Sequence, residues 1–206
     1  MKTEPRPNAI ILAGPNGAGK STLAPHLLVG ELEVRTFVNA DVIAQGLAGF
    51  DPASAAIQAG RIMLQRLDEL RATGSNFAFE TTLSGLWLRR TISSLHASGY
   101  ATRLVYVWVP DPEVSVGRVH SRVLMGGHDV PAEDVRRRFY RSVRNFEQVY
   151  RRMVTSWWVY DARRPVATEA PLLIAHGSGD TIWEIHDRDA WERIQAQAAL
   201  RNEGET

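Results

Sequence analysis

The 206-residue sequence has no cysteine, only two lysines and no long hydrophobic run. The absence of cysteine excludes disulfide frameworks, thiolate metal sites and cysteine nucleophiles, and it is compatible with a reducing compartment. The longest apolar run covers residues 104–109, far short of the roughly 20 residues that span a bilayer. The first residues, MKTEPRPNAI, also lack the apolar segment of a signal peptide. These absences predict a cytoplasmic protein with no membrane partner.

The scarcity of lysine makes the basic charge almost entirely arginine. Only Lys2 and Lys20 are lysines among the 24 basic residues, and 11 arginines lie between residues 118 and 164 against five acidic residues. The stretch therefore carries +6 (11 minus 5) in a chain of net charge +1. Such an excess suits bidentate phosphate recognition or nucleic-acid binding, although most charge runs are solvated helix faces.

Length and composition predict a single domain. Roughly 100–200 residues form one domain, and a chain of this length can bury about 70% of its unfolded surface. Hydrophobic residues make up 44% of the chain and charged residues 23%, which is typical of a globular protein. We expect one domain over residues 1–206, with its core at about residues 8–190.

A phosphate-binding motif stands near the start of the chain. Residues 14–21 read GPNGAGKS, which is the P-loop pattern. Its glycines let backbone amides approach phosphate oxygens, its lysine reaches the β and γ phosphates, and its serine hydroxyl binds Mg²⁺. The expected cofactors are therefore ATP and Mg²⁺, with Lys20 also catalytic and Ser21 the metal ligand. The predicted ATP-binding residues are Gly14, Pro15, Asn16, Gly17, Ala18, Gly19, Lys20, Ser21 and Thr22.

Short apolar runs alternate with helical patterns along the rest of the chain, which is typical of a layered α/β fold. We predict a three-layer P-loop NTPase sandwich with a mostly parallel central sheet, a helical lid at about residues 115–145 and a C-terminal β-hairpin. Strands are expected at residues 9–13, 34–39, 76–80, 101–109, 157–160, 172–175 and 181–185. Helices are expected at residues 20–28, 52–72, 84–98, 111 to the glycines at 126 and 127, 131–153 and 189–200.

Two acidic residues follow strands that are expected to end at one edge of the sheet. Asp41 comes 21 residues after Lys20, just past the second strand, and Glu80 ends the third. Loops at the carboxyl ends of strands in an open α/β sheet face the ligand crevice. Asp41 could accept the proton of an attacking hydroxyl, or it could cap a short helix starting at Val42. Glu80 could serve Mg²⁺, hold a substrate hydroxyl, or make only backbone hydrogen bonds.

Three arginines are candidates for contact with the transferring phosphate. Arg118 and Arg122 are four residues apart on one predicted helix, so they share a face. They lead into residues 126–131 (GGHDVP), a segment typical of a mobile lid that delivers arginines and excludes water. Arg138 flanks the apolar stripe of the following helix and is the third candidate. His128 is either a phosphate contact or a turn residue.

The other histidines give no sign of a metal site. Those at positions 96, 120, 176 and 186 have no metal-ligand spacing, and no Ser-His-Asp grouping can be argued. Any metal is therefore expected to be Mg²⁺ that arrives with the nucleotide.

An ordered set of motifs makes the chain resemble the zeta toxin family of P-loop kinases, in particular its small stand-alone branch. The resemblance covers about residues 8–190. The segments that carry it are the P-loop, residues 39–41 (NAD), 79–82 (FETT), 126–131 (GGHDVP), 137–146 (RRFYRSVRNF) and 160–161 (YD).

This resemblance implies a kinase that uses ATP and Mg²⁺ to phosphorylate a sugar hydroxyl, because the best-known members act on the 3′-hydroxyl of UDP-N-acetylglucosamine. By the same resemblance Lys20 and Ser21 bind nucleotide and Mg²⁺, and Asp41 is the general base. Glu80 and Thr82 lie near substrate or Mg²⁺, and an antitoxin protein is a further expected partner.

The resemblance also assigns the lid arginines to the transferring phosphate. His128 stands where the toxins carry a lid arginine, so Arg122 or Arg138 is expected to take that role.

The function expected from the sequence is thus an ATP- and Mg²⁺-dependent small-molecule kinase, with UDP-N-acetylglucosamine as the first acceptor to try. One alternative is a nucleoside, antibiotic or polynucleotide kinase. Strong salt-dependent nucleic-acid binding by residues 118–164 would favour the polynucleotide version, although nucleic acid is not an expected partner. The other alternative is a catalytically silent nucleotide-binding interaction module.

Overall fold

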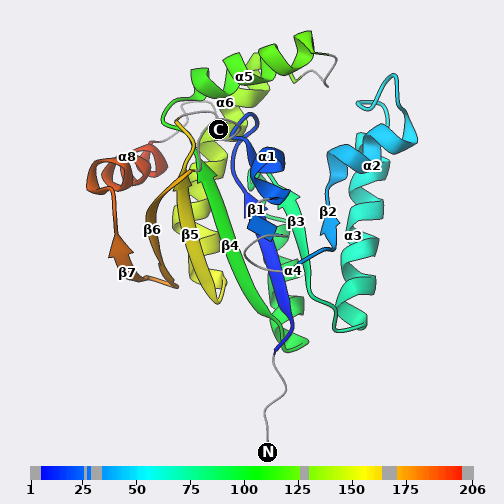
Figure 1. The fold of residues 1–206 in the computed structure, drawn as a ribbon, viewed down its shortest axis with the longest axis horizontal. Helices are drawn as coiled ribbons and strands as arrows, with labels where there is room; N and C mark the ends of the chain where they lie inside the picture. Colours follow the sequence, from blue (N-terminus) through cyan, green and yellow to red (C-terminus); the bar gives the residue numbers. More distant parts are fainter. Residues whose placement is uncertain (1–5, 26, 29–33, 126–129, 164–170, 201–206) are drawn as a thin grey trace, which may run out of the picture.

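The computed structural model describes residues 6–25, 27–28, 34–125, 130–163 and 171–200, which form a seven-stranded sheet with helices around it (Figure 1). The strand order is β2-β3-β1-β4-β5-β6-β7. All neighbours from β2 to β5 are parallel, whereas β6 and β7 continue the sheet as an antiparallel hairpin. The strands are β1 Asn8–Ala13, β2 Phe37–Val38, β3 Phe77–Thr81, β4 Ala101–Trp108, β5 Ser156–Asp161, β6 Leu172–Ser178 and β7 Thr181–Ile185. The predicted mostly parallel sheet and C-terminal hairpin are confirmed.

Helices lie on both faces of this sheet, which confirms the three-layer prediction. In Figure 1, α1 lies in front of β1, whereas α4 and α6 lie behind the sheet. The helices are α1 Lys20–Ala24, α2 Ala40–Leu47, α3 Ala56–Ala72, α4 Leu88–Ala97, α5 Pro112–Leu124, α6 Ala132–Asn145, the π-helical turn η2 Phe146–Tyr150, α7 Arg151–Met153 and α8 Arg188–Ala199. None of the helices in the described part of the chain combines the length and apolarity that a membrane crossing requires.

Several element ends differ from the prediction for local reasons. The helix α3 begins at Ala56 instead of residue 52, because Asp51 caps a separate turn: the Asp51 carbonyl accepts a 2.8 Å hydrogen bond from Ser54 Oγ. The predicted helix at residues 20–28 is α-helical only over α1, and residues 25, 27 and 28 continue it in π-helical form, since Pro25 has no amide hydrogen for the α-helical ladder. The strand β2 is shorter than predicted, since it pairs with β3 at only two positions.

The helical run α6–η2–α7 confirms the predicted helix at residues 131–153 and anchors one side of the core. Its apolar stripe, including Phe139, Val143 and Phe146, is fully buried. The rings of Phe146 and Tyr106 of β4 stack with their centroids 4.5 Å apart. This packing fixes the helix against β4 and sets where its polar side chains meet the loops of the site.

Candidate active site

The P-loop follows β1 and packs so tightly at Gly14 and Gly17 that no other residue fits there. Gly14 has φ 144°, and a Cβ there would lie 2.3 Å from the Val107 carbonyl oxygen. Gly17 has φ 73°, and a Cβ would lie 2.7 Å from the Ser115 carbonyl oxygen. Both positions therefore need glycine for conformation and for space. The loop backbone is held against β4 and α5, which leaves a cradle of main chain of the kind that fits phosphate groups.

Glu80 contacts side chains from the start of α1 and from the N-cap of α2. Lys20 is buried, donates a 2.9 Å hydrogen bond from Nζ to the Pro15 carbonyl, and lies 3.5 Å from Glu80 Oε1. Ser21 Oγ donates to Glu80 Oε2 at 2.8 Å, and Asn39 Nδ2 donates to the same oxygen at 2.9 Å. The pairing of β1 with β3 places Leu12 opposite Glu80, which brings the strand-end acid beside the start of the P-loop. Of the roles considered for Glu80, backbone-only hydrogen bonding is wrong.

Asp41 lies in the first turn of α2, but it does not cap that helix. The cap is Asn39, whose Oδ1 accepts hydrogen bonds from the Asp41 amide at 2.8 Å and the Val42 amide at 3.4 Å. No hydrogen bond or ion pair joins the Asp41 carboxylate to another residue in the described ranges, and the side chain is exposed. The sequence alternative in which Asp41 caps the helix is therefore wrong.

Two adjoining pockets meet at Asp41. The first, which we call the Ser21 pocket, has a volume of about 440 Å³, and the second, the Trp87 pocket, about 430 Å³. The Ser21 pocket is lined by Ser21, Asn39, Ala40, Asp41, Val42, Ala44, Gln45, Gly49, Phe50, Asp51, Pro52, Ala56 and Arg122. The Trp87 pocket is lined by Asn39, Ala40, Asp41, Ile57, Gly60, Arg61, Met63, Leu64, Glu80, Thr81, Thr82 and Trp87. Asp41 thus faces both a space beside the P-loop serine and a second space beyond it.

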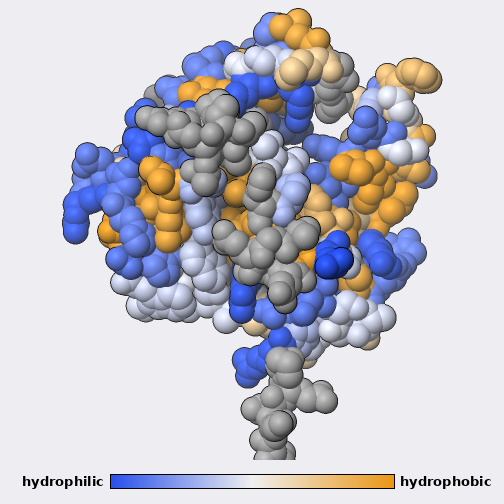
Figure 2. All heavy atoms as spheres, viewed as in Figure 1, coloured by the Kyte–Doolittle hydropathy of each residue, from blue (hydrophilic) through white to orange (hydrophobic). Residues whose placement is uncertain are grey.

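The Trp87 pocket has an apolar wall beside its charged groups. Ile57 is 76% exposed, and Leu64 and Trp87 about 40%. Figure 2 shows apolar surface gathered over α2 and α3 on this side of the molecule. Arg61 of α3 supplies a positive charge in the same pocket. The arrangement suits a ligand that has a flat or apolar part, a polar part and an anionic group.

Thr82 belongs to a loop that the α6–η2 run holds in position. Leu83 has the left-handed φ of 59°, and its carbonyl accepts a 2.8 Å hydrogen bond from Asn145 Nδ2. The Tyr150 hydroxyl donates to the Gly85 carbonyl at 2.6 Å, and burial raises the pKa of Tyr150 to about 12. These contacts hold residues 82–87 out of helical form, so α4 begins at residue 88 instead of residue 84. Thr82 and Trp87 are thereby presented to the Trp87 pocket.

The three candidate arginines lie in different surroundings. Arg118 donates to the carbonyls of Ala162 at 2.7 Å and Gly17 at 3.4 Å, and burial lowers its pKa. Arg122, one turn later on α5, lines the Ser21 pocket. Arg138 is partly buried on α6 and lines neither pocket. Arg118 therefore braces the P-loop backbone, and Arg122 is the arginine that reaches the pocket beside Ser21.

The proposed lid is only partly described. Residues 126–129, which include His128, lie outside the described residues. The helices on either side are α5 and α6, and Arg136 of α6 makes a bidentate ion pair with Glu113 of α5, with Nε–Oε1 at 2.6 Å and Nη2–Oε2 at 2.9 Å. Val119, Val130 and Val135 form a small apolar cluster separate from the main core.

The donor set next to the P-loop fits Mg²⁺ with a nucleotide. Ser21 offers a hydroxyl and Glu80 a carboxylate, and Mg²⁺ prefers such oxygen ligands together with substrate phosphates. The glycine cradle and the buried Lys20 supply the matching phosphate contacts.

Sequence reasoning missed three residues of the site: Asn39, Arg61 and Trp87. Asn39 carries a usable signal, since asparagine is a favoured helix N-cap, but its contact with Glu80 depends on the pairing of strands. Arg61 lies on a helix with an ordinary amphipathic pattern, so the sequence does not distinguish it from a solvent-exposed arginine. Trp87 carries no signal, because a lone tryptophan after a strand reads as packing.

Comparison with known proteins identifies the domain type. The family profile described as an AAA domain (AAA_33) matches residues 10–148. A curated protein of Haemophilus influenzae, named as uncharacterized, is 31% identical over 127 residues, which is 62% of this chain and 88% of that protein.

Three solved structures share the fold at low sequence identity. A complex of AvrRxo1-ORF1 and AvrRxo1-ORF2 with sulphate ions has a TM-score of 0.74 and 16% identity over 97% of this chain, which spans 66% of the matched chain, just under two thirds of its length. The PezAT chromosomal toxin-antitoxin system of Streptococcus pneumoniae has a TM-score of 0.63 and 17% identity, covering 95% of this chain and 86% of that one. A gluconokinase of Sinorhizobium meliloti has a TM-score of 0.51 and 13% identity, covering 94% of both chains.

Proposed function

This chain belongs to the AAA domain family AAA_33, and on that premise we propose that it is a kinase that uses ATP and Mg²⁺ to phosphorylate a hydroxyl of a small molecule. The observation that carries the proposal is the position of Asp41, whose carboxylate has no partner among the described residues and which lines both the Ser21 pocket and the Trp87 pocket. A phosphoryl donor beside Ser21 and a hydroxyl acceptor in the Trp87 pocket would meet at this carboxylate.

The P-loop side of the site binds the donor in this proposal. The backbone of residues 14–19 holds the phosphates, and Lys20 moves from the Pro15 carbonyl to the β and γ phosphates. Ser21 and Glu80 would hold Mg²⁺, which when bound neutralises charge on the phosphate oxygens. Arg118 donates hydrogen bonds to the Gly17 carbonyl of the P-loop and to the Ala162 carbonyl after β5. It therefore holds the phosphate-binding backbone in position.

Asp41 is the general base of the proposed reaction. Its carboxylate takes the proton of the acceptor hydroxyl while that oxygen forms a bond to the γ phosphorus. The bond from the γ phosphorus to the bridging oxygen breaks, and ADP leaves with the electron pair. Arg122 supports the transferring phosphoryl group because it lines the same pocket as Ser21. Arg138 lines neither pocket, so its proposed contact with the phosphoryl group from the lid side rests on the sequence alone.

The acceptor that the Trp87 pocket favours has a ring, a hydroxyl and an anionic group. Trp87 offers a face for a planar ring, Arg61 a charge for a phosphate, and Thr82 a hydroxyl that already bonds with Ser84 Oγ at 2.9 Å. UDP-N-acetylglucosamine combines these features, and we propose it as the first acceptor to test. The fold shared with the PezAT system supports a further proposal, that an antitoxin protein binds the chain.

The test of this function is the substitution Asp41→Asn, which keeps the shape of the side chain and removes its basicity. We expect phosphotransfer to UDP-N-acetylglucosamine, or to whichever acceptor the wild type uses, to fall about 10²–10⁴-fold. Binding of ATP, measured by calorimetry, should change less than about twofold, because Asp41 does not contact the P-loop.

Asp51→Asn is the matched control, since Asp51 lines the Ser21 pocket but only caps a turn. It should keep turnover within a fewfold of the wild type. Near-normal activity of Asp41→Asn would contradict the assignment of Asp41 as the general base.

A further inference from the structure

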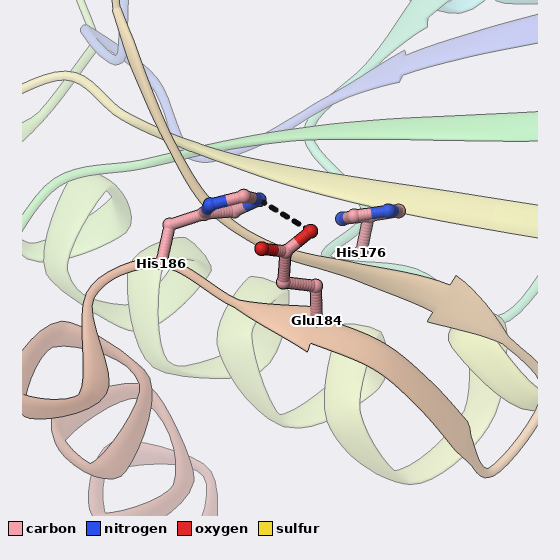
Figure 3. A group of neighbouring side chains, drawn as sticks. All are labelled: His176, Glu184 and His186. Atoms are coloured by element: carbon pink, nitrogen blue, oxygen red, sulfur yellow. Dashed lines mark ion pairs between the residues drawn. The ribbon is translucent and has the colours of Figure 1, made fainter.

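Three side chains with metal-binding groups gather on the C-terminal hairpin, at the opposite edge of the sheet from β2 and Asp41. They are His176 of β6, Glu184 of β7 and His186, which directly follows β7 (Figure 3). One potential ligand atom of each lies within 4.8 Å of the corresponding atoms of the other two. The group lies far from the P-loop in the strand order, so it is independent of the proposed kinase site.

The hairpin register explains why these side chains meet. His176 and Glu184 are direct cross-strand partners in the antiparallel pair β6–β7. His186 is two residues beyond Glu184, so both side chains point to the same face of the strand. The backbone at His186 is fixed by a 2.7 Å hydrogen bond from its amide to the Ile174 carbonyl. Glu184 on β7, His186 just past the end of β7 and His176 on β6 therefore lie close together.

The sequence alone gave no sign of this group, because the spacing from residue 176 to residue 186 matches no familiar metal motif. The turn between β6 and β7 reverses the chain, so residues 176 and 186 come close together in space. The structure thus brings together His176 and His186, which the spacing in the sequence did not group.

One nitrogen of the group has no hydrogen-bond partner in the described part of the chain. His176 Nδ1 is buried and has no hydrogen-bond partner among the described residues. The imidazoles of His176 and His186 lie nearly parallel, with centroids 5.7 Å apart and planes 12° apart. Glu184 Oε2 lies 3.6 Å from His186 Nε2, which is longer than a hydrogen bond. A buried nitrogen without a partner costs stability, and a metal ion would supply that partner.

We propose that His176, Glu184 and His186 bind one Zn²⁺ ion. Two imidazole nitrogens and one carboxylate oxygen are a common protein ligand set for Zn²⁺, which leaves a fourth position for water or another ligand. The ion joins β7 to β6. β7 is the edge strand of the sheet and is largely exposed, so this cross-link would hold the hairpin together.

The experiment measures zinc binding by the full chain, purified without a histidine tag and stripped of metal. Zn²⁺ is titrated against a competing chromogenic chelator, and Co²⁺ is used as a spectroscopic substitute. The variants are His176→Ala, Glu184→Gln and His186→Ala. The control is His120→Ala, which removes an exposed histidine of α5 outside the group.

We expect the wild type and His120→Ala to bind one Zn²⁺ per chain and to give the visible absorption of Co²⁺ bound to protein nitrogen. Each histidine variant should lower zinc affinity by about 100-fold or more, since changes outside the first ligands already cost about 10–100-fold. Glu184→Gln should weaken binding less than either histidine variant but well beyond His120→Ala. Melting temperatures of the metal-free variants check that each one folds.

Two results would overturn the proposal. One is a wild type that binds no Zn²⁺ in competition with the chelator, which would leave only an ion pair between Glu184 and His186. The other is equal zinc affinity in the wild type and the three variants, which would put the ion elsewhere in the chain. Neither result bears on phosphotransfer, because Asp41 and the P-loop take no part in this binding.

Discussion

Glu80 is the residue through which the P-loop, α2 and β3 are joined. It accepts hydrogen bonds from Ser21 and Asn39 and lies beside the ammonium group of Lys20. A carboxylate in this position can hold Mg²⁺ next to the P-loop serine and can also keep Lys20 in place. Loss of the Glu80 carboxylate should therefore weaken Mg²⁺ binding more than ATP binding.

Glu80→Gln tests this role, because glutamine keeps the acceptor oxygen for Ser21 and Asn39 but loses the charge. We expect the Mg²⁺ concentration for half-maximal phosphotransfer to rise about 10–100-fold. ATP binding without Mg²⁺, measured by calorimetry with a chelator present, should change much less. Glu69→Gln on the exposed face of α3 is the control. An unchanged Mg²⁺ dependence in Glu80→Gln would contradict the assignment.

For single residues, the sequence predicts which side chains are functional better than it predicts which other residues they contact. The P-loop motif and the two strand-end acids are readable because each follows an apolar run. The placement of Asn39 against Glu80 depends on the parallel register of β2, β3 and β1, which single-sequence patterns do not encode. The different surroundings of Arg118 and Arg122 also depend on the loop after β5.

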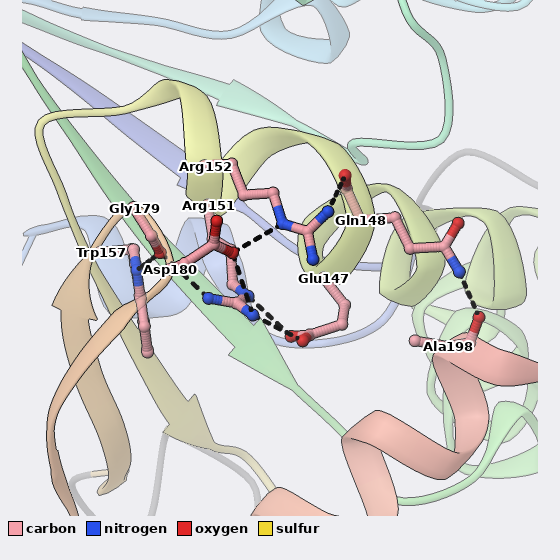
Figure 4. Close-up of polar contacts among 8 residues, drawn as sticks. All are labelled: Glu147, Gln148, Arg151, Arg152, Trp157, Gly179, Asp180 and Ala198. Carbon is pink, nitrogen blue, oxygen red and sulfur yellow. Dashed lines mark hydrogen bonds and ion pairs between the residues drawn. The ribbon is translucent and has the colours of Figure 1, made fainter.

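At the scale of elements, the run α6–η2–α7 connects the site to the C-terminal hairpin. Its middle holds the loop after β3 through Asn145 and Tyr150. Its end holds the β6–β7 turn through Arg151, which is buried (Figure 4). Arg151 makes two hydrogen bonds to Glu147, at 2.8 and 3.0 Å, and one to the Gly179 carbonyl at 3.0 Å.

Removing Arg151 should therefore destabilise the whole fold. Arg151→Met leaves the largely buried carboxylate of Glu147 without its partner, and we expect the free energy of unfolding to fall by about 3–5 kcal/mol. Urea denaturation measures this loss. The double variant Glu147→Leu/Arg151→Met should recover much of it, because no unpaired buried charge remains.

Arg152→Met is the matched control, since the neighbouring arginine is half exposed and its ion-pair partner among the described residues is the exposed Asp180. Its effect should stay within about 0.5 kcal/mol. A loss below about 1 kcal/mol for Arg151→Met would show that the buried pair does not hold the hairpin.

Apolar periodicity predicts this helix well, because Phe139, Val143 and Phe146 follow a helical spacing. It does not predict the π-helical turn, in which one extra residue is accommodated without changing the apolar pattern. Nor does it predict that α3 and α4 begin late, since the competing contacts of Asp51 and Tyr150 are made by side chains outside the helical patterns.

At the scale of the whole molecule, the order of the parallel strands determines where the chemistry lies. Ser21, Asp41 and Glu80 come from three separate strand-to-helix connections, and all follow or end strands that run in the same direction. Ligands bind at this carboxyl edge in open α/β sheets. The alternation of strands and helices in the sequence is sufficient to predict this edge, whereas the shape of the two pockets comes from how α2, α3 and the loop after β3 pack.

The proposed activity requires that the phosphoryl donor ATP and the hydroxyl acceptor bind next to each other, on either side of Asp41. The most direct measurement is mass spectrometry of the acceptor after incubation with ATP, Mg²⁺ and a panel of nucleotide sugars, nucleosides, small alcohols and oligonucleotides. We predict that the wild type adds one phosphoryl group to a hydroxyl of a small molecule, with UDP-N-acetylglucosamine the first candidate, and that Asp41→Asn does not. ATP binding without phosphorylation of any member of the panel, or equal product from Asp41→Asn, would contradict the account.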